Sequence, residues 1–352
     1  MRLLVLEGDG IGPEICAATM KVVRYIDAKL SLGCDFVYDK VGRKSLESYG
    51  TTWSSATEEL ARTCDGIILG PVDTFSYPEG QPNPSARIRK NFDLYANIRP
   101  AKTRPTFKKN TWPIDCVVFR ENTEGFYADR SMFAGSGEFC PTEDVAISMR
   151  KITTKACLRI AKSAFSYAAR HNKAVTAVHK ANVLKLTDGM FLDCIRQTAL
   201  HYPSVQWEEI IVDAMAAHLV RTPERFDVIV TTNMYGDILS DLTAEMSGGL
   251  GLGASINAGD DFAMAQAVHG SAPDIAGQNI ANPTSLILSV ALLFTWWAQE
   301  KQNQDFARAA HILETCVDHT LQKPESATPD VGGNGSTQAF ADEVCSAIEA
   351  GI

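Results

Sequence analysis

Short apolar runs alternate with amphipathic stretches along most of the chain, and this alternation predicts strands and helices in turn. An apolar run at residues 2–6 leads into the glycine turn GDGIGPE and then into an amphipathic stretch. Pro13 suits the first turn of a helix, so we expect a strand, a tight turn and a helix here. Further strands are expected at residues 34–38 and 66–69, with a helix at 54–63 between them. This order is typical of parallel α/β architecture.

The same alternation returns in the second half of the chain. We expect strands at residues 174–179, 205–212 and 226–231, separated by helices at 183–202 and 214–220. Strands that are joined through helices pair in parallel, so a parallel sheet is expected here too.

Three segments lack this alternation. Residues 70–84 are loop-like, and residues 125–147 contain glycine and proline, which predicts an irregular arm outside the core. The longest apolar run, at residues 284–298, is too short to cross a bilayer and predicts a buried helix. We therefore expect no membrane-spanning segment.

Composition narrows the possible function classes. The chain has 352 residues, 45% of them hydrophobic and 21% charged, which suits a globular protein with a sizeable core. Its formal net charge of -9 argues against binding to nucleic acid or anionic membranes. Nine cysteines without a CxxC pair suggest reduced thiols, and the N-terminal apolar run is too short for a signal peptide. We expect a cytoplasmic protein.

Three arginines are candidates for an anion-binding cluster inside this acidic chain. Arg89 follows the loop-like segment, and Arg99 and Arg120 each end a strand-like run. Proteins of the α/β class gather ligand residues at strand ends, and converging guanidinium groups bind carboxylates through paired hydrogen bonds. The alternative is that each arginine forms an ordinary surface ion pair.

Acidic residues in the second half indicate a cation site. Asp237 and Asp241 lie four residues apart on one face of a predicted helix, and Asp213 ends a strand. Carboxylates without cysteine or histidine suit Mg2+ or Mn2+. A solvated helix start, stabilised by the helix dipole, explains the same spacing equally well. Lys180 also follows a strand, where it either faces solvent or lies near a cation that favours its neutral form.

The glycine turn at residues 8–12 is a weaker signal. Such a turn can bring backbone amides close to a phosphate at a helix N-terminus. However, it lacks the GxGxxG spacing, and a tight turn without a ligand explains it as well.

Six motifs occur in order across nearly the whole chain: GDGIGPE, DLYANIRP, RENTEGFYAD, HKANVL, TTNMYGDILSDL and HGSAPDIAG with IANP. In this combination the sequence resembles the isocitrate/isopropylmalate dehydrogenase family of β-decarboxylating dehydrogenases. Within that family it is most similar to homoisocitrate and NAD-type isocitrate dehydrogenases, through residues 6–8, 101–105 and 120–125.

The resemblance implies a reaction and assigns residues to it. The expected reaction is the NAD-dependent oxidation of a 3-substituted (R)-malate with loss of its β-carboxylate as CO2. The substrate carboxylates would be bound by Arg89, Arg99 and Arg120, and Mg2+ or Mn2+ by Asp213, Asp237 and Asp241. The metal would act as a Lewis acid. Lys180 would accept the hydroxyl proton, and Tyr127 would protonate C3.

The resemblance also implies a cofactor site without the ordinary Rossmann arrangement. The expected cofactor contacts are Ile11, Asn182, His269, Gly270, Ser271, Ala272, Asp274, Ile275, Asn282 and Asp330. NADP-using relatives resemble one another in having Lys-Tyr at the place of Asp274-Ile275. An aspartate there would repel a 2′-phosphate, so NAD is the expected cofactor.

The family fold implies two α/β domains around a cleft. Residues 1–97 and 246–352 would form the large cofactor-binding domain, and residues 98–245 an inserted small domain with the dimer interface. A homodimer with shared active sites is expected, in which Lys180 and Asp213 reach into the partner's cleft.

Two departures from the family pattern leave the substrate open. Gln266 stands where the family often has glutamate, and the loop at residues 77–87 matches none of the subfamilies well. Asn83 and Ser85 in this loop suit a polar group at C3, so isocitrate or homoisocitrate is expected before 3-isopropylmalate. Tartrate or D-malate is a further alternative.

Two other classes of protein were weighed against this reaction. A catalytically silent NAD-binding homologue would have lost the metal aspartates, the lysine or the tyrosine, and all of them are present. A metal-dependent hydrolase or lyase would use the same acidic cluster, but it would have no use for the NAD-type segment.

Overall fold

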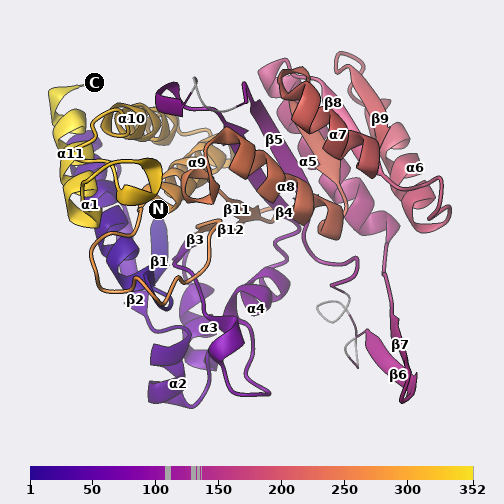
Figure 1. The fold of residues 1–352 in the computed structure, drawn as a ribbon, viewed down its shortest axis with the longest axis horizontal. Helices are drawn as coiled ribbons and strands as arrows, with labels where there is room; N and C mark the ends of the chain where they lie inside the picture. The colour runs from indigo at the N-terminus through magenta and orange to yellow at the C-terminus, as the bar shows by residue number, and fades with distance from the viewer. Residues whose placement is uncertain (108–111, 128–131, 133–134, 136, 352) are drawn as a thin grey trace.

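A mixed β-sheet forms the centre of the molecule (Figure 1). The structure is a computed structural model that describes residues 1–107, 112–127, 132, 135 and 137–351. In these residues the strands are β1 (Arg2–Leu6), β2 (Asp35–Asp39), β3 (Gly66–Leu69), β4 (Ala96–Lys102), β5 (Asp115–Glu121), β6 (Glu138–Thr142), β7 (Val145–Ser148), β8 (Val175–His179), β9 (Trp207–Ile211), β10 (Val228–Thr231), β11 (Ile256–Ala258) and β12 (Ala263–Gln266). Ten of these described strands form one sheet in the order β2-β1-β3-β12-β11-β4-β5-β10-β8-β9, and β6 pairs only with β7.

Helices cover both faces of this sheet. They are α1 (Gly12–Leu30), α2 (Arg43–Tyr49), α3 (Ser55–Ala61), α4 (Pro84–Asn91), α5 (Thr154–His171), α6 (Thr187–Ala199), α7 (Val212–Arg221), α8 (Asn233–Ser247), α9 (Thr284–Lys301), α10 (Gln304–Thr320) and α11 (Thr337–Ala350). Phe119 of β5 packs against Tyr167 of α5, with ring centroids 5.3 Å apart, whereas the next residue, Arg120, contacts Asn233 of α8. Because consecutive strand residues face opposite sides, α5 and α8 cover opposite faces of β5.

The expected parallel pairing is confirmed in both outer parts of the sheet. Strands β2, β1, β3 and β12 pair in parallel, and so do β5, β10, β8 and β9. The centre of the sheet, for which no pairing is predicted, has β12, β11, β4 and β5 in antiparallel pairs. No α-helix separates β4 from β5 or β11 from β12 in the described residues, and neighbouring strands joined without a crossover helix pair antiparallel.

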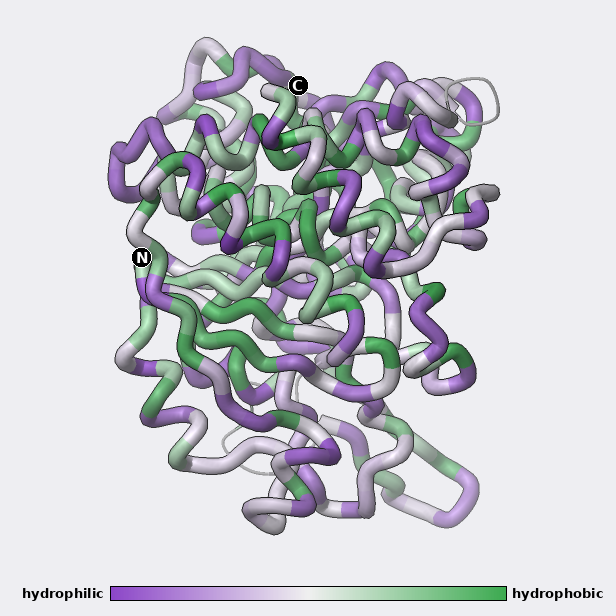
Figure 2. Tube along the Cα trace, turned by 90° about the vertical axis from the view of Figure 1, so that its left-hand side faces the viewer, coloured by the Kyte–Doolittle hydropathy of each residue, from purple (hydrophilic) through white to green (hydrophobic). Residues whose placement is uncertain are grey.

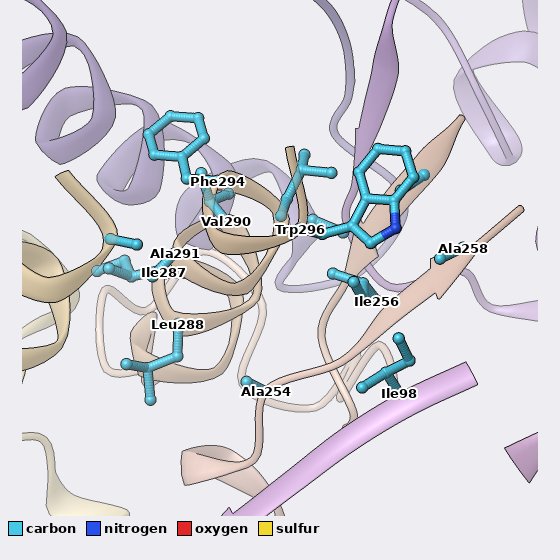
Figure 3. Packing of buried hydrophobic residues seen from close by; sticks show 14 of the residues in the cluster. Ile98, Ala254, Ile256, Ala258, Ile287, Leu288, Val290, Ala291, Phe294 and Trp296 are labelled. Carbon is cyan, nitrogen blue, oxygen red and sulfur yellow. The ribbon is translucent and has the colours of Figure 1, made fainter. Parts of the chain in front are cut away.

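Apolar residues concentrate in the strands and in the inward faces of the helices (Figure 2). Helix α9 is buried along most of its length, which confirms the buried helix expected at residues 284–298. Its residues Leu288, Val290 and Phe294 belong to the main hydrophobic core, and Trp296 projects from it over β11 (Figure 3). Within the described ranges, no helix is long and apolar enough to cross a membrane.

Two segments expected to be irregular contain regular structure. The loop expected at residues 70–84 includes a 3₁₀ turn, Thr74–Ser76, and ends where α4 begins. The arm expected at residues 125–147 contains the β6–β7 hairpin, so its description as irregular is wrong in part; some of its residues lie outside the described ones. Every residue of both hairpin strands is exposed. Neither face is buried, so the sequence lacks the apolar and polar alternation that marks a strand.

The local positions of two site residues also differ from expectation. Asp213 was expected to end a strand, but β9 ends at Ile211 and Asp213 lies in the first turn of α7. Arg99 was expected at a strand end and lies in the middle of β4. Helix α7 begins before the apolar residues that predict it, and strand β4 continues past them to Lys102. Element boundaries are the least certain part of a prediction from sequence.

The glycine turn after β1 is explained by close backbone contacts. Gly10 has a φ of 57°, and a Cβ atom added to it would lie 2.0 Å from the carbonyl oxygen of Ser271. Between the glycines, the buried carboxylate of Asp9 accepts hydrogen bonds from the backbone amides of Arg43 (2.8 Å) and Asp73 (3.0 Å) and from the Tyr77 hydroxyl. The turn therefore joins β1 to three separate segments, and this structural role alone accounts for its glycines.

Replacement of Gly10 by alanine should destabilise the fold by roughly 2–4 kcal/mol, because the backbone conformation is strained and the new methyl group meets backbone. Urea unfolding followed by circular dichroism measures this change. The matched control is Gly189→Ala in α6, where no atom lies within 4 Å of the added Cβ. The control should be neutral or stabilising by up to about 1 kcal/mol, since alanine favours helix. Equal effects of the two substitutions would contradict this explanation of the turn.

Candidate active site

Basic side chains and a tyrosine surround the carboxylate of Asp237, near the start of α8. Arg120 forms an ion pair with its Oδ1 atom, and the Tyr127 hydroxyl donates a hydrogen bond of 2.9 Å to Oδ2. Arg99 contributes a second ion pair at 3.6 Å, and Arg89 lies near enough to act on the charge of Asp237. Burial alone would raise the pKa of Asp237, but these guanidinium groups and the tyrosine hydrogen bond hold it below its usual value. The carboxylate is therefore ionised at neutral pH.

The motif TTNMYGDILSDL places Arg120 as well as Asp237. The Arg120 side chain is only 3% exposed, and its Nε donates 3.0 Å hydrogen bonds to both the backbone and side-chain oxygens of Asn233. A Cβ atom on Gly236 would lie 2.5 Å from Arg120 Cγ, so glycine is needed where the arginine crosses α8. The spacing of Asn233, Gly236 and Asp237 therefore places all three residues on the helical turn that contacts the Arg120 guanidinium group.

Asp241 lies one turn further along α8 and belongs to the same cluster. Arg99 Nη1 lies 2.7 Å from its Oδ1 atom and also donates a 2.8 Å hydrogen bond to Ser240. Burial raises the pKa of Asp241, the Arg99 charge lowers it, and the neighbouring charge of Asp237 raises it, so that the net shift is upward. Two carboxylates and two arginines therefore face each other between β4, β5 and α8.

Lys180 and Asp213 form a second group. They follow the neighbouring parallel strands β8 and β9, and their side chains form an ion pair in which the Asp213 side chain is 68% exposed. Its hydrogen bond with Lys180 holds the pKa of Asp213 below its usual value. No contact joins this pair to Asp237 or Asp241 within the described residues. The structure thus brings two of the three expected metal ligands together and leaves the third apart.

The carboxylates near Asp237 fit a divalent cation only in part. Asp237 and Asp241 offer hard oxygen atoms on one helical face, as Mg2+ and Mn2+ require. In the part of the chain that the structure describes, however, no group of three or more histidine, cysteine, aspartate or glutamate residues could hold a metal ion. A site built from Asp237 and Asp241 would take its other ligands from water, from substrate oxygens or from a residue outside this cluster.

A cavity of about 260 Å³ lies where most of the expected cofactor contacts meet. It is lined by Ile11, Gly251, His269, Gly270, Ala272, Ile275, Ile280, Ala281, Asn282 and Asp330. The Asn282 amide donates a 2.9 Å hydrogen bond to Asp330, which fixes one wall. The Nε2 atom of His269 is buried and makes no hydrogen bond with a described residue. A buried polar atom of this kind fits a ligand with hydrogen-bonding groups, such as a nucleotide.

The remaining expected cofactor contacts lie at different distances from this cavity. The backbone oxygen of Ser271 accepts a 2.8 Å hydrogen bond from Ile11, and the exposed Asp274 follows in the same loop. Asn182 is exposed beside Lys180 and does not line the cavity. It therefore belongs with the Lys180–Asp213 pair in the single chain.

One of the two expected specificity residues, Ser85, contacts Gln266 at the end of β12. Ser85 donates a 3.0 Å hydrogen bond to Gln266 Oε1, and Arg89 Nη2 donates one of 3.3 Å to the same atom. The amide that replaces the usual glutamate thus faces the candidate substrate arginine. Asn83 is exposed, and its Oδ1 accepts a hydrogen bond from the backbone of Ala86 at the start of α4. Asn83 therefore retains only its amide nitrogen as a donor.

Sequence reasoning missed several residues that position the site. Asp188 is fully buried, forms an ion pair with Arg150, and accepts a 2.5 Å hydrogen bond from the backbone of Lys180. Glu14 of the first helix accepts hydrogen bonds from the backbone amides of Gly277 (2.9 Å) and Ala281 (3.3 Å), next to the cofactor cavity. Both residues are acids on a helical face that is otherwise largely buried. Because a buried charge needs a partner, such an acid in a predicted helix indicates a structural contact.

Comparison with known proteins places the chain in a family. The family model described as isocitrate/isopropylmalate dehydrogenase matches residues 2–344. Among curated proteins, the isocitrate/homoisocitrate dehydrogenase of Thermus thermophilus is 41% identical over 351 residues, covering 99% of this chain and 98% of that protein. The 3-isopropylmalate dehydrogenase of Sulfurisphaera tokodaii is 37% identical over 340 residues, covering 97% of both chains.

A solved structure gives the same result. The crystal structure of isocitrate dehydrogenase from Methylococcus capsulatus superposes with a TM-score of 0.85, at 36% sequence identity, and covers 99% of both chains. The chain belongs to the isocitrate/isopropylmalate dehydrogenase family, as its motifs predicted, and the expected fold is confirmed. It is thus related over its whole length to oxidative decarboxylating dehydrogenases.

The turn that carries Lys180 should be sensitive to acid. Burial lowers the pKa of His179, and its Nδ1 atom accepts a 3.0 Å hydrogen bond from Ala181, which requires the neutral ring. A histidine whose pKa is lowered by folding stabilises the fold above its unfolded value of about 6.5, and this contribution is lost as the pH falls through the folded value.

We therefore expect His179→Asn, which keeps a hydrogen-bond acceptor, to lose less stability than the wild type between pH 7.5 and pH 5.5. Urea unfolding at both pH values measures the difference, and the other histidines are the same in both proteins. Identical pH dependence of the two proteins would show that His179 is not held neutral.

Proposed function

We propose that this protein catalyses the NAD-dependent, metal-assisted oxidative decarboxylation of a 3-substituted (R)-malate of the isocitrate or homoisocitrate class. The observation that carries the proposal is the group of Arg99, Arg120 and Tyr127 around Asp237. Guanidinium groups that face a carboxylate cluster from one side suit a dicarboxylate substrate bound next to a cation. The 41% identity to an isocitrate/homoisocitrate dehydrogenase over nearly the whole chain supports the same class.

The chain's own residues divide the chemistry between them. Arg89, Arg99 and Arg120 bind and orient the substrate carboxylates. Lys180 accepts the proton of the C2 hydroxyl group, and Tyr127, whose hydroxyl already donates to Asp237, delivers a proton to C3 after CO2 has left. Asp237 and Asp241, with an Asp213 side chain from the second subunit, would hold Mg2+ or Mn2+, which would supply a Lewis acid at the C2 oxygen.

The cavity beside His269 is the proposed NAD site. Ile11, Gly270, Ala272, Ile275, Asn282 and Asp330 line it with His269. Bound there, NAD supplies the hydride acceptor. Asp274 is exposed beside this cavity, where its charge disfavours a 2′-phosphate and so favours NAD over NADP. The backbone oxygen of Ser271 accepts a hydrogen bond from Ile11 of this lining, and Asn182 would reach the site from the second subunit.

A homodimer with shared active sites explains the separation of Lys180 and Asp213 from Asp237. Helix α6 and the turn before it expose Leu186, which is 88% accessible, and also Val183 and Met190. Large apolar side chains exposed together are typical of subunit interfaces. In the proposed dimer, residues 98–245 form the small domain that carries this interface, and residues 1–97 with 246–352 form the large domain. None of the nine cysteines, all of which the structure describes, forms a disulfide, which suits a cytoplasmic protein.

Subunit mixing tests the shared site directly. The variants Lys180→Met and Asp237→Asn should each be nearly inactive, the first without its proton acceptor and the second without a metal ligand. A heterodimer of the two variants contains one site with both residues intact, so statistical mixing should restore roughly a quarter of wild-type activity. Denaturation and refolding of the mixture, followed by an NAD reduction assay, measures the recovery.

Each variant refolded alone serves as the control and should stay inactive. If heterodimers verified by mass spectrometry have no activity, then Lys180 and Asp237 act within one subunit and the shared-site proposal fails.

The polar groups near Arg89 should select the substrate's third group. A branched hydrocarbon would leave Ser85 and Asn83 facing apolar surface, at a cost of roughly 1–3 kcal/mol. We expect kcat/KM for isocitrate or homoisocitrate to exceed that for 3-isopropylmalate by about tenfold or more. Ser85→Ala should reduce this ratio, because it removes the hydroxyl group without adding volume at this buried position.

A preference for 3-isopropylmalate by tenfold or more would refute the substrate assignment and leave the reaction class intact. A preference for tartrate or D-malate in the same assays would favour the alternative of a smaller polar group at C3.

A further inference from the structure

A second cavity, of about 410 Å³, lies between α5 and α9. Its floor is formed by β4, β5 and β11, and its walls by the two helices. Cavities of roughly 300–1,000 Å³ are typical of small-molecule sites. None of the residues assigned above to substrate, metal or cofactor lines it.

This cavity lies on the opposite face of the sheet from the candidate active site. Ile98 and Phe119 line it, whereas their chain neighbours Arg99 and Arg120 contact α8. Consecutive residues of a strand point to opposite sides of the sheet. The cavity is therefore directly behind the arginines of the active site and separate from the substrate and NAD sites.

The inner part of the cavity is apolar and has one unused hydrogen-bond donor. The indole of Trp296 projects from α9 over β11, beside Ile256 and Ala258 (Figure 3). Trp296 is only 8% exposed, yet its Nε1 atom makes no hydrogen bond with any described residue. This N–H group is not one of the buried, unpartnered atoms of the described residues, so it is open to the cavity and can donate to an acceptor on a bound molecule.

The rim on the α5 side is basic. Lys162 and Arg170 line the cavity, and neither forms an ion pair within the described ranges. Arg159, a third rim cation, is paired with Asp93 at 2.5 Å. On the opposite side, the hydroxyl of Tyr95 donates a 3.0 Å hydrogen bond to Asp260, and Asp260 and Glu300 are the two acids that line the cavity away from α5. Two uncommitted cations on one helix face favour an anionic group next to α5.

We propose that this cavity binds an aromatic carboxylate. The ring lies against the floor of Ile98, Phe119 and Ile256 beneath Trp296, where apolar burial and ring stacking stabilise it. The carboxylate lies toward Lys162 and Arg170, which supply charge-assisted hydrogen bonds. This inference does not depend on the reaction proposed above, because it concerns a different cavity.

Calorimetric titration of the full-length protein with 2-naphthoate tests the proposal without any activity measurement. We expect saturable binding of one molecule per chain. The double variant Lys162→Glu/Arg170→Glu should raise the Kd at least tenfold, because both exposed cations become repulsive. The matched control is Lys155→Glu, a charge reversal at an exposed position on the same helix outside the cavity, which should leave the Kd unchanged.

Two further measurements separate this site from other binding. Ser166→Trp, which adds a large side chain from α5 into the cavity, should abolish binding while circular dichroism shows an unchanged fold. The cation 2-naphthylmethylammonium should bind at least tenfold more weakly than 2-naphthoate. The proposal is overturned if the wild type shows no saturable binding, if Ser166→Trp binds like the wild type, or if the cation binds as tightly as the anion.

Discussion

The buried guanidinium group of Arg120 is the feature on which the candidate active site depends. Its side chain is almost fully enclosed between β5 and α8. An uncompensated charge in such a place costs roughly 3–5 kcal/mol, so the surrounding chain must supply partners. Asn233 accepts hydrogen bonds from the guanidinium group, and Asp237 forms an ion pair with it. Gly236 has no side chain, so the arginine can pass close to the helix backbone. The same constraint therefore fixes the start of α8 and the position of the proposed metal-binding carboxylates.

From this centre the site extends in two directions. On the side of β12, Arg89 and Ser85 both donate hydrogen bonds to Gln266. These bonds connect the proposed substrate-binding residues to β12 and to the loop that follows it beside the cofactor cavity. Toward the other edge, Asp188 holds the backbone of Lys180 while Lys180 pairs with the exposed Asp213. In one chain two carboxylates, Asp237 and Asp241, lie next to each other, and the proposed homodimer would add the partner subunit's Asp213 to them.

The sequence predicted those features that depend on local pattern. Strands β1 and β3 were placed residue by residue because each is an uninterrupted apolar run, and the order of six motifs was sufficient to identify the family. The antiparallel centre of the sheet was missed because it depends on which strands lack a helix between them. The β6–β7 hairpin was missed because none of its residues is buried.

For the site residues, too, local spacing could be predicted from the sequence and long-range contacts could not. Spacing alone placed Asp237 and Asp241 on one helical face, but it could not show that Arg120 holds the first of them. The contact between Ser85 and Gln266 joins residues 181 positions apart, and that between Asp188 and Arg150 joins residues 38 apart. Contacts of this kind follow from the tertiary fold and have no local signature in the sequence. Gln266 was noticed as a departure from the family, yet only the structure placed it beside Arg89.

In the proposed reaction, oxidation at C2 and loss of the β-carboxylate occur together at this site. It is tested most directly by the stoichiometry of the two products. Homoisocitrate or isocitrate labelled with 13C at the β-carboxylate would be incubated with the protein, NAD and Mg2+, and NADH and labelled CO2 would be counted together. The account predicts one labelled CO2 for each NADH, with both products absent when the divalent cation is removed by a chelator. NADH without CO2, or CO2 without NADH, would contradict it.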